Sequence, residues 1–279
     1  MVKNIAICIL TLNESHNIKL CIESLKRNDF FDIHVIDSGS KDETVKIAQE
    51  LDVKVYVNIQ SGVYSAAEQR NWALINVESP SDYLLFVDAD EILPIEFGSK
   101  LLKFFDDESN AKYDVYSIPL LYHFHGKKIK SMGYPNWHDR LISRNVHFVS
   151  SVGEFVPTDN RRNVESIYIV HNFNSLGMRR FIEKQARYAE YIGSETFRFR
   201  NGETVSYFEK SDHNGRLKRS IAKLNFSRPF LRFCYLYFYK GGIFEGREGF
   251  IVAFYMSVFE FMVVLSALEC ERVYKGQTL

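Results

Sequence analysis

The sequence predicts an α/β protein in which a mixed, mostly parallel sheet is flanked by helices and followed by a helical C-terminal extension. Short apolar runs alternate with amphipathic segments through residues 5–90. Polar clusters follow directly after those runs, and the last third of the chain is basic and aromatic. The chain has 279 residues, 46% of them hydrophobic, which is enough for one large domain and an extension.

The first half contains four short apolar runs of the kind that form buried strands, separated by segments with helical spacing. We expect strands at Ile5–Leu10, Ile33–Ile36, Val53–Val57 and Tyr83–Val87, and helices at Asn13–Lys26, Ser40–Leu51 and Ala66–Ile75. Repeated strand–helix units of this length predict a mostly parallel sheet with helices on both faces. In such sheets, ligands bind beyond the carboxyl ends of the strands.

The second half is less regular. Residues 113–171 are strand-like and rich in Tyr, Phe and His, which favours a mixed sheet with loops, and Ser175–Phe197 has helical spacing. The polar stretch 201–214 is the best candidate for a boundary. We therefore expect a domain at residues 1–200, with halves at 1–112 and 113–200, and an extension at 201–279.

Charge and cysteine content narrow the function classes. The chain has 35 Lys and Arg and 35 Asp and Glu, so its formal net charge is zero, which argues against a nucleic-acid partner. Its four cysteines lack the spacing of a zinc site and suit a reducing cytoplasm. The apolar run at the N-terminus is too short for a signal peptide. We expect a cytoplasmic protein.

Two carboxylates follow the fourth predicted strand, in the sequence Asp88-Ala89-Asp90. Residues i and i+2 of an extended chain point the same way, so both side chains can face one site. Hard oxygen ligands in this position suit Mg²⁺ or Mn²⁺ that bridges a substrate diphosphate. The alternative is a solvated acidic turn that also includes Glu91.

Polar residues also follow the first two strands. Asp37 can accept a hydrogen bond from a base N–H, and Ser40 can cap the following helix. Asn13 occupies a similar position after the first strand, where capping is again the alternative role. Arg70 lies within the third predicted helix and either faces a nucleotide or lies on the surface.

Four motifs in this half resemble those of family 2 glycosyltransferases in order and spacing. They are Leu10-Thr11-Leu12-Asn13-Glu14, Val35 to Thr44 with Asp37-Ser38-Gly39-Ser40 inside it, Gln69-Arg70-Asn71-Trp72-Ala73-Leu74, and Phe86-Val87-Asp88-Ala89-Asp90-Glu91. The resemblance implies a GT-A fold and an inverting, metal-dependent hexosyltransferase whose donor is a nucleotide sugar, commonly UDP-linked. It also implies nucleotide-binding roles for Thr11, Asn13, Glu14, Asp37, Ser38, Arg70 and Asp88, and a metal held by Asp88 and Asp90.

The resemblance extends into the second half, which is similar to the subgroup that builds bacterial lipopolysaccharide core. Two segments match that subgroup, Trp137 to Arg144 and Val152-Gly153-Glu154. The subgroup usually has Val-His-Glu where this chain has Val152-Gly153-Glu154. The match implies that residues 113–200 bind a glycan or lipid-linked glycan acceptor and that Glu154 is the catalytic base. Asp139 and Asp159 are the other candidate bases. His171 ends a strand-like run and is a further candidate ligand of the metal or diphosphate.

Two other classes of function stay open. A sugar nucleotidyltransferase has a similar nucleotide-binding sheet, but it wants a glycine-rich basic loop that Ile9 to Ser15 does not provide. An inactive glycan-binding protein could keep the transferase fold, although Asp88, Asp90 and Glu154 are all present. A Rossmann dehydrogenase is disfavoured because no GxGxxG follows a strand.

The last third of the chain predicts contact with a membrane. Basic and aromatic residues alternate from Arg216 to Arg232, and Gly249–Leu268 is almost wholly apolar with one charge at Glu260. Such a tail suits peripheral attachment to an anionic membrane surface, at the inner face of the plasma membrane. A helix packed within the protein and a helix that spans the bilayer are the alternatives.

Overall fold

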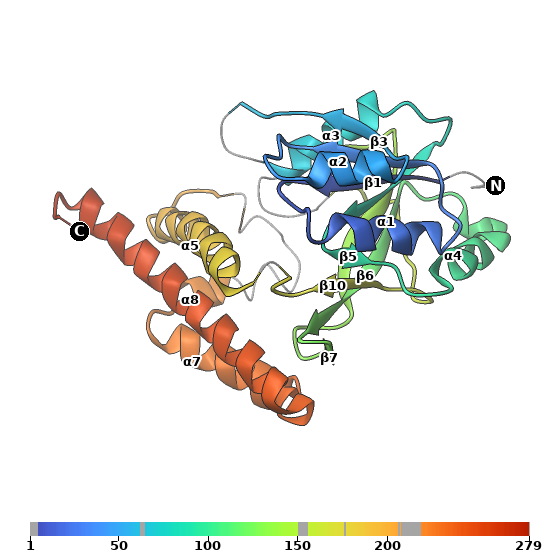
Figure 1. Ribbon diagram of the computed structural model, residues 1–279. Coiled ribbons are helices and arrows are strands. Elements are labelled where there is room, and N and C mark those ends of the chain that lie inside the picture. The colour runs from blue at the N-terminus through green and yellow to red at the C-terminus, as the bar shows by residue number, and fades with distance from the viewer. Residues whose placement is uncertain are drawn as a thin grey trace. The chain divides into compact units, whose positions relative to one another are not determined.

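The structure is a computed structural model that describes residues 5–61, 65–149, 156–175, 177–205, 207 and 219–278. The chain divides into two compact units (Figure 1). The first unit comprises Met1–His123 and Tyr134–Ser175, and the second comprises Phe124–Gly133 and Leu176–Leu279.

The first unit is built on a mixed sheet whose strand order is β3-β2-β1-β4-β8-β6-β10-β5. The strands in or next to this path are β1 (Ile5–Thr11), β2 (Ile33–Asp37), β3 (Lys54–Val57), β4 (Tyr83–Asp88), β5 (Glu91–Ile92), β6 (Val115–Phe124), β7 (Lys127–Ile129), β8 (Asn136–Ser143), β9 (Arg161–Asn163) and β10 (Ile169–Asn172). Strands β1 to β4 pair in parallel, whereas β8 is antiparallel to both β4 and β6. The predicted α/β architecture with a mostly parallel sheet is therefore confirmed.

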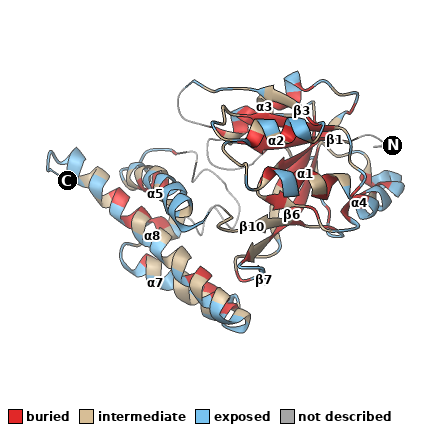
Figure 2. Ribbon diagram, viewed as in Figure 1, coloured by how far each residue is buried: buried red, intermediate tan, exposed pale blue. Residues whose placement is uncertain are grey.

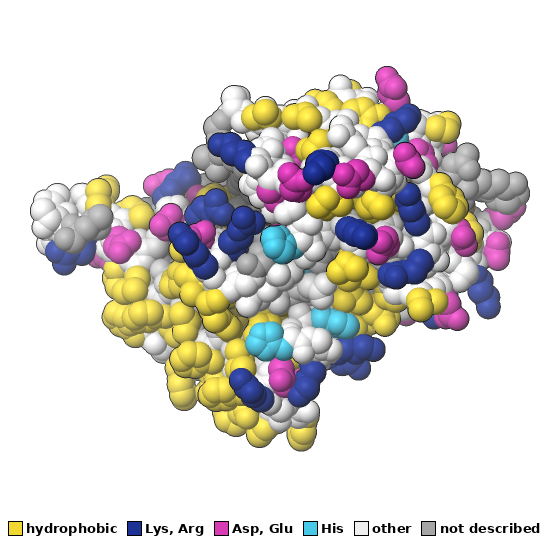
Figure 3. Space-filling model, in the orientation of Figure 1, with side chains coloured by type: hydrophobic (Ala, Val, Ile, Leu, Met, Phe, Trp, Pro, Cys, Tyr) yellow, Lys and Arg dark blue, Asp and Glu magenta, His cyan; other side chains and the backbone are white. Residues whose placement is uncertain are grey.

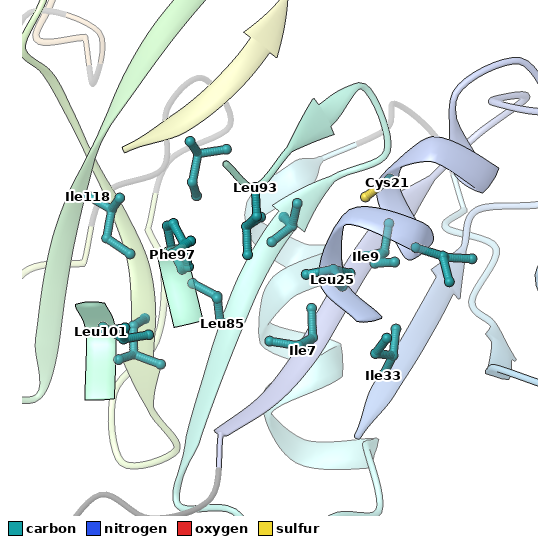
Figure 4. Close-up of a cluster of buried hydrophobic side chains, with 14 of the residues drawn as sticks. Ile7, Ile9, Cys21, Leu25, Ile33, Leu85, Leu93, Phe97, Leu101 and Ile118 are labelled. Carbon is teal, nitrogen blue, oxygen red and sulfur yellow. The ribbon is translucent and has the colours of Figure 1, made fainter. Parts of the chain in front are cut away.

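Both faces of this sheet are buried. Alternate residues of β1 point to opposite faces, so Ile7 and Ile9 join one apolar cluster while Ala6 and Cys8 join the other. Figure 4 shows the first cluster, in which Leu25 packs against these strands. The helices of this unit are α1 (Ile18–Lys26), α2 (Thr44–Glu50), α3 (Ala66–Asn76) and α4 (Phe97–Asp106), with a short 3₁₀ turn η1 (Glu108–Asn110). The continuous apolar runs of the sequence are thus explained by burial on two faces.

The second unit is helical, as the sequence predicts for the C-terminal extension. Its helical elements are α5 (Met178–Arg200), α7 (Ser227–Cys234), the π-helical turn η3 (Tyr235–Tyr239), the 3₁₀ turn η4 (Gly242–Glu245) and α8 (Gly246–Tyr274), and the short strand β7 also falls within this unit. Helices α5 and α7 both pack along α8 (Figure 1).

The grouping of α5 differs from the sequence-based expectation. We expected Ser175–Phe197 within a domain that ends at residue 200, but α5 groups with the C-terminal helices. The reason is apolar packing, since Ala189 and Ile192 form one buried cluster with Val263 of α8. Residue 200 as a functional boundary stays a prediction.

Candidate active site

Three strands of the first unit end at the same edge of the sheet. In the pairing of β1 with β2, Thr11 lies opposite Asp37, and in the pairing of β1 with β4, Leu10 lies opposite Asp88. Strand β1 thus lies between β2 and β4, whose connections leave the sheet in different directions. Ligand sites of open α/β sheets form at such a point.

The carboxylate of Asp37 is buried and organises the turn after β2. Its Oδ1 accepts hydrogen bonds from the hydroxyls of Thr11 (2.9 Å) and Ser40, and its Oδ2 accepts from the backbone N–H groups of Gly39 (2.9 Å) and Ser40 (2.8 Å). Gly39 has φ +92°, a conformation that glycine adopts readily. Because a carboxylate offers about four acceptor positions, these four bonds fill it. The geometry supports a role for Asp37 in shaping this loop.

The loops that follow β1 and β2 are tied to each other. The backbone N–H of Asn13 donates to the Ser40 hydroxyl at 2.8 Å, and the Asn13 side-chain oxygen accepts from the N–H of Lys41 at 2.8 Å. The N–H of Glu14 donates to the Thr44 hydroxyl at 2.8 Å. The predicted helix cap at Ser40 is wrong, because α2 begins at Thr44 and the Ser40 hydroxyl belongs to the Asp37 turn.

Ser38 differs from its neighbours in this region. Its backbone N–H donates to the Thr11 carbonyl at 3.0 Å, which holds the turn against β1. Its hydroxyl oxygen is buried and has no hydrogen-bond partner among the described residues. The sequence predicts that Ser38 contacts the nucleotide. The hydroxyl of Ser38 does not take part in the hydrogen bonds that tie the two loops together.

Asp88 lies between two buried arginines. Arg70 of α3 donates from Nη2 to Asp88 Oδ1 at 3.0 Å, and Arg140 of β8 approaches Asp88 Oδ2 with its Nη2 at 3.4 Å. Both arginine side chains are 1% exposed, and the Arg70 guanidinium also lies over the rings of Phe86 and Phe148. Arg70 therefore lies in the interior next to Asp88, and the alternative of a surface arginine is wrong.

Glu91 is a buried carboxylate that the sequence motifs did not single out for a role. One of its oxygens accepts a hydrogen bond from Arg140 at 2.5 Å, and the other accepts from the backbone N–H of Asp88 at 2.9 Å. Burial raises the pKa of Glu91, and the adjacent Arg140 guanidinium opposes that shift. Glu91 thereby fixes both the backbone of Asp88 and the position of Arg140.

Asp90 faces a different partner from Asp88. The chain turns at Ala89 and Asp90 before it enters β5, so the two aspartates are not on an extended segment as expected. Nδ1 of His171 lies 3.5 Å from Asp90 Oδ1 and 3.6 Å from Glu91 Oε1. His171 is held there because β10 pairs with β5 in an antiparallel register that puts His171 opposite Glu91. Asp90 and His171 are therefore neighbours, as a shared ligand would require.

The pair of Asp90 and His171 fits a divalent cation that also binds a substrate diphosphate. Mg²⁺ is usually bound by one or two carboxylates together with substrate phosphates rather than by a complete protein cage. Among the described residues, no three His, Cys, Asp or Glu side chains group as a metal site. The side chains of Asp90 and His171 are partly buried, at 14% and 18% exposure. Asp88 contacts arginines, and its role as a metal ligand stays a prediction.

The three candidate bases are in different situations. Asp139 is 3% exposed and accepts hydrogen bonds from Ser117, from Arg161 (2.9 Å) and from the backbone N–H of Val156 (3.1 Å). Asp159 is exposed. Glu154 lies outside the described residues. The ion partner of Asp139 is Arg161 and not the neighbouring Arg140, so Asp139 is committed to holding the backbone at Val156.

Sequence reasoning missed Arg140 and Glu91 as members of the site. Both belong to motifs that the sequence offered, one in Trp137–Arg144 and one directly after Asp90. No spacing rule pairs them, because they are 49 positions apart and meet only through the sheet. The signal available in the sequence was Glu91 itself, an acidic residue that comes shortly after the apolar strand Tyr83–Val87.

The chain belongs to glycosyl transferase family 2, because the sequence model of that family matches residues 6–185. An uncharacterized glycosyltransferase of Rickettsia bellii is 34% identical to it over 121 residues, which is 43% of this chain and 39% of that protein. The match thus spans about two fifths of the relative's length. The predicted membership of family 2 is confirmed.

Two solved structures show distant likeness. The Staphylococcus aureus protein TarS, residues 1–349, is 14% identical with a TM-score of 0.45, covering 98% of this chain and 92% of that one. Glucosyl-3-phosphoglycerate synthase from Mycobacterium tuberculosis, solved with Mn²⁺, UDP-glucose and phosphoglyceric acid, is 17% identical with a TM-score of 0.47. That match covers 73% of this chain and 81% of the synthase. These scores are too low to bear on the chemistry of this chain.

Proposed function

We propose that the chain is an inverting hexosyltransferase that moves a sugar from a UDP-linked donor to a hydroxyl group of a glycan acceptor. The supporting observation is the turn after β4. There Asp90 lies beside His171, and Asp88 lies between Arg70 and Arg140. In a member of glycosyl transferase family 2, this arrangement at the edge where β1, β2 and β4 end suits a nucleoside diphosphate.

The proposed nucleotide pocket is formed by the loops after β1 and β2. Thr11, Asn13, Glu14 and Asp37 shape these loops through the hydrogen bonds described above. The Ser38 hydroxyl is the side-chain group proposed to contact the nucleotide directly. Arg70 contributes by holding Asp88, since its Nη2 donates to that carboxylate.

The proposed chemistry at the diphosphate rests on Asp90 and His171. A divalent cation, Mg²⁺ or Mn²⁺, held by these two side chains would offset the negative charge on the departing nucleoside diphosphate. Arg140 and Glu91 keep the turn in place, because Glu91 fixes the Asp88 N–H and also pairs with Arg140.

The proposed base is Glu154. It accepts the proton of the acceptor hydroxyl while that oxygen attacks the anomeric carbon from the face opposite the diphosphate. The bond to the diphosphate breaks as the new glycosidic bond forms, which inverts the configuration. Support comes from the family resemblance at Val152-Gly153-Glu154 and from the commitment of Asp139 to Arg161.

The proposed acceptor is a lipopolysaccharide core or another surface polysaccharide under construction on a lipid. The resemblance of Trp137–Arg144 supports that class of acceptor. We place the protein in the cytoplasm, attached to the inner face of the plasma membrane through its helical unit. The apolar character of α8 supports this attachment.

A turnover assay tests the proposal. The purified chain is incubated with UDP-sugars, candidate glycan acceptors and Mn²⁺, and release of UDP and glycan product is measured. We expect transfer that stops in excess EDTA. Full turnover in EDTA would overturn the role of the metal. Release of pyrophosphate from UTP and a sugar phosphate would indicate a nucleotidyltransferase, and glycan binding without turnover would indicate an inactive fold.

A further inference from the structure

We infer that the second unit binds an anionic lipid bilayer with α8 lying in the plane of the membrane surface rather than crossing it. This inference deepens the proposed membrane attachment and rests on it.

Helix α8 by itself is long and apolar enough to cross a membrane. The helical stretch Gly242–Tyr274 has 33 residues, and its most apolar window has a mean hydropathy of 2.1. About 20 apolar residues suffice to span a bilayer. Only 33% of that window is buried in the protein, so much of it faces outward. Length and composition therefore do not distinguish a span from a surface helix.

The packing of α5 against α8 distinguishes them. A Cβ at Gly193 of α5 would lie 2.5 Å from the Ser266 side chain, so the two helices are in close contact at that point. Ser266 also donates a hydrogen bond to the Glu190 carbonyl at 3.3 Å, and Ile192 packs against Val263. If α8 crossed the bilayer with this packing intact, α5 would have to enter the hydrocarbon with it.

Helix α5 cannot enter hydrocarbon at reasonable cost. Nine of its 23 residues are charged, namely Arg179, Arg180, Glu183, Lys184, Arg187, Glu190, Glu195, Arg198 and Arg200. A charged residue at the centre of a membrane helix opposes insertion even on the most lenient scale. The close contact with such a polar helix keeps α8 at the surface.

The exposed apolar residues of α8 form one stripe along its length. The α8 stripe consists of Phe250, Phe254, Val258, Phe261 and Leu265, each between 40% and 56% exposed. Their spacing of three and four residues puts all of them on one face of the helix. Figure 2 shows buried and exposed residues along α8, as expected of a helix with one outward face.

Neighbouring elements extend the α8 stripe. The Phe226 ring before α7 lies 6.4 Å from that of Phe261, and Phe230 one turn further on is 68% exposed. On the other side, an apolar groove of about 380 Å³ separates the stripe from Met178 and Ile182 of α5. Figure 3 shows hydrophobic side chains gathered over the helical unit, with basic ones beside them.

The one carboxylate within the apolar part of α8 does not oppose this orientation. Glu260 forms an ion pair with Arg228 of α7, and both side chains are largely buried, at 14% and 8% exposure. The charge is therefore neutralised inside the helical unit. The α8 stripe can enter the headgroup region without an unpaired carboxylate.

Charge identifies the occupant of this apolar face. The second unit contains 20 Lys and Arg and 11 Asp and Glu, a net charge of +9, whereas the first unit has 15 and 24, a net charge of −9. Exposed basic side chains lie in the first turn of α8 and on elements that contact α8, namely Arg247 in that turn, Lys128 and Lys130 in and directly after β7, and Lys240 between η3 and η4. Each Lys or Arg near an anionic leaflet adds to the electrostatic attraction. A second copy of this strongly basic unit would be repelled.

Flotation of the full chain on vesicles tests the inference. We expect binding to phosphatidylglycerol vesicles, weak binding to phosphatidylcholine vesicles, and release by high salt or alkaline carbonate. Phe254→Ser with Phe261→Ser should weaken binding at least about tenfold, which corresponds to 1.4 kcal/mol. The control Ile75→Ser with Ile95→Ser removes two apolar side chains of the first unit that are even more exposed, and it should leave binding unchanged.

Probe depth distinguishes a helix in the plane from a span. Environment-sensitive dyes are attached to Phe250→Cys, Val258→Cys or Leu265→Cys in a chain that also has Cys234→Ser and Cys270→Ser. We expect the same shallow depth at all three positions. Deepest insertion at residue 258, with release only by detergent, would overturn the inference in favour of a span.

The remaining outcomes also decide the question. Failure to bind anionic vesicles overturns the inference. Self-association that the stripe substitutions abolish would then identify a second copy as the occupant. The inactive variant Asp90→Asn should float like the unaltered chain. Failure of turnover with intact flotation would reject the proposed transferase and leave the membrane inference standing.

Discussion

In the first unit, Arg70, Glu91 and Arg140 are each at most 1% exposed, whereas in the second unit Phe230, Tyr239 and Phe244 are at least 68% exposed. The first unit thus buries charge and pairs it, while the second presents apolar rings to its surroundings. Buried ion pairs fix geometry at a cost in desolvation, which suits a site for a small charged ligand. Exposed aromatic rings next to basic residues suit an apolar surface outside the protein.

The largest expected effect concerns the catalytic base. It distinguishes a residue that takes part in the reaction, Glu154, from one that stabilises the first unit, Asp139. Glu154→Gln should lower turnover by about 10²–10⁴, the usual contribution of a general base, while donor binding and thermal stability persist. Asp139→Asn should mainly lower stability, because it weakens the pair with Arg161 and the bond to the Val156 N–H. Normal turnover in Glu154→Gln with loss in a folded Asp139→Asn would exchange their roles.

The next effect tests the metal pair. Asp90→Asn should reduce metal-dependent turnover by about 10³, since a bound cation supplies several kcal/mol of charge stabilisation and 4 kcal/mol is about three decades. Asp90 is not part of the buried arginine network, so unfolding should change by no more than about 0.5 kcal/mol. Calorimetric titration of Mn²⁺ with UDP provides a second measurement. Unchanged titration in both Asp90→Asn and His171→Gln would reject this site.

Substitution of the adjacent carboxylate, Glu91, should mainly lower stability, whereas substitution of Asp90 should mainly lower turnover. Glu91→Gln leaves Arg140 buried with a weaker partner, so we expect the free energy of unfolding to fall by about 3–5 kcal/mol. Denaturant unfolding measures this change. Asp90→Asn, one residue away, is the matched control. A stability change in Glu91→Gln no larger than that in Asp90→Asn would show that the first unit does not depend on its buried charges.

Substitution of Asp37 should lower both stability and ligand binding, each by a smaller amount. Asp37→Ala removes an acceptor shared by Thr11, Gly39 and Ser40, so we expect a loss of about 1.5–3 kcal/mol in stability. UDP affinity should also fall, because the loop after β2 loses its shape. The control Thr11→Val removes one of these bonds. Full stability together with lost UDP binding would instead support direct contact between Asp37 and the base.

The smallest effect compares the cysteines of the two units. Cys8 and Cys21 are fully buried in the first unit, and burial raises the pKa of both thiols. Cys234 and Cys270 of the second unit are partly exposed. A thiol reagent should therefore modify two of the four cysteines in the native protein and all four after unfolding. Rapid native modification of Cys8 would indicate that the first unit opens more easily than its packing suggests.

Much of the fold could be predicted from the sequence because its information is local. Apolar runs such as Tyr83–Val87 have the length and composition of buried strands, and the actual strand Tyr83–Asp88 agrees. The helix expected at Ala66–Ile75 is found at Ala66–Asn76. The family was also evident from four motifs in order. Helix starts were less well predicted, because Asn13 and Ser40 bond to each other's loops instead of capping helices.

The sequence by itself determined the strand and helix pattern, the carboxylates after β4 and the apolar character of α8. Only the tertiary structure decided what each charge meets. Asp88 contacts two arginines and Asp90 contacts His171 because the chain turns at Ala89 and because β8 and β10 approach from distant positions. The outward face of α8 was likewise set by α5 and α7, which cover its other sides. Such partners depend on strand order and helix packing, and spacing along one chain does not specify either.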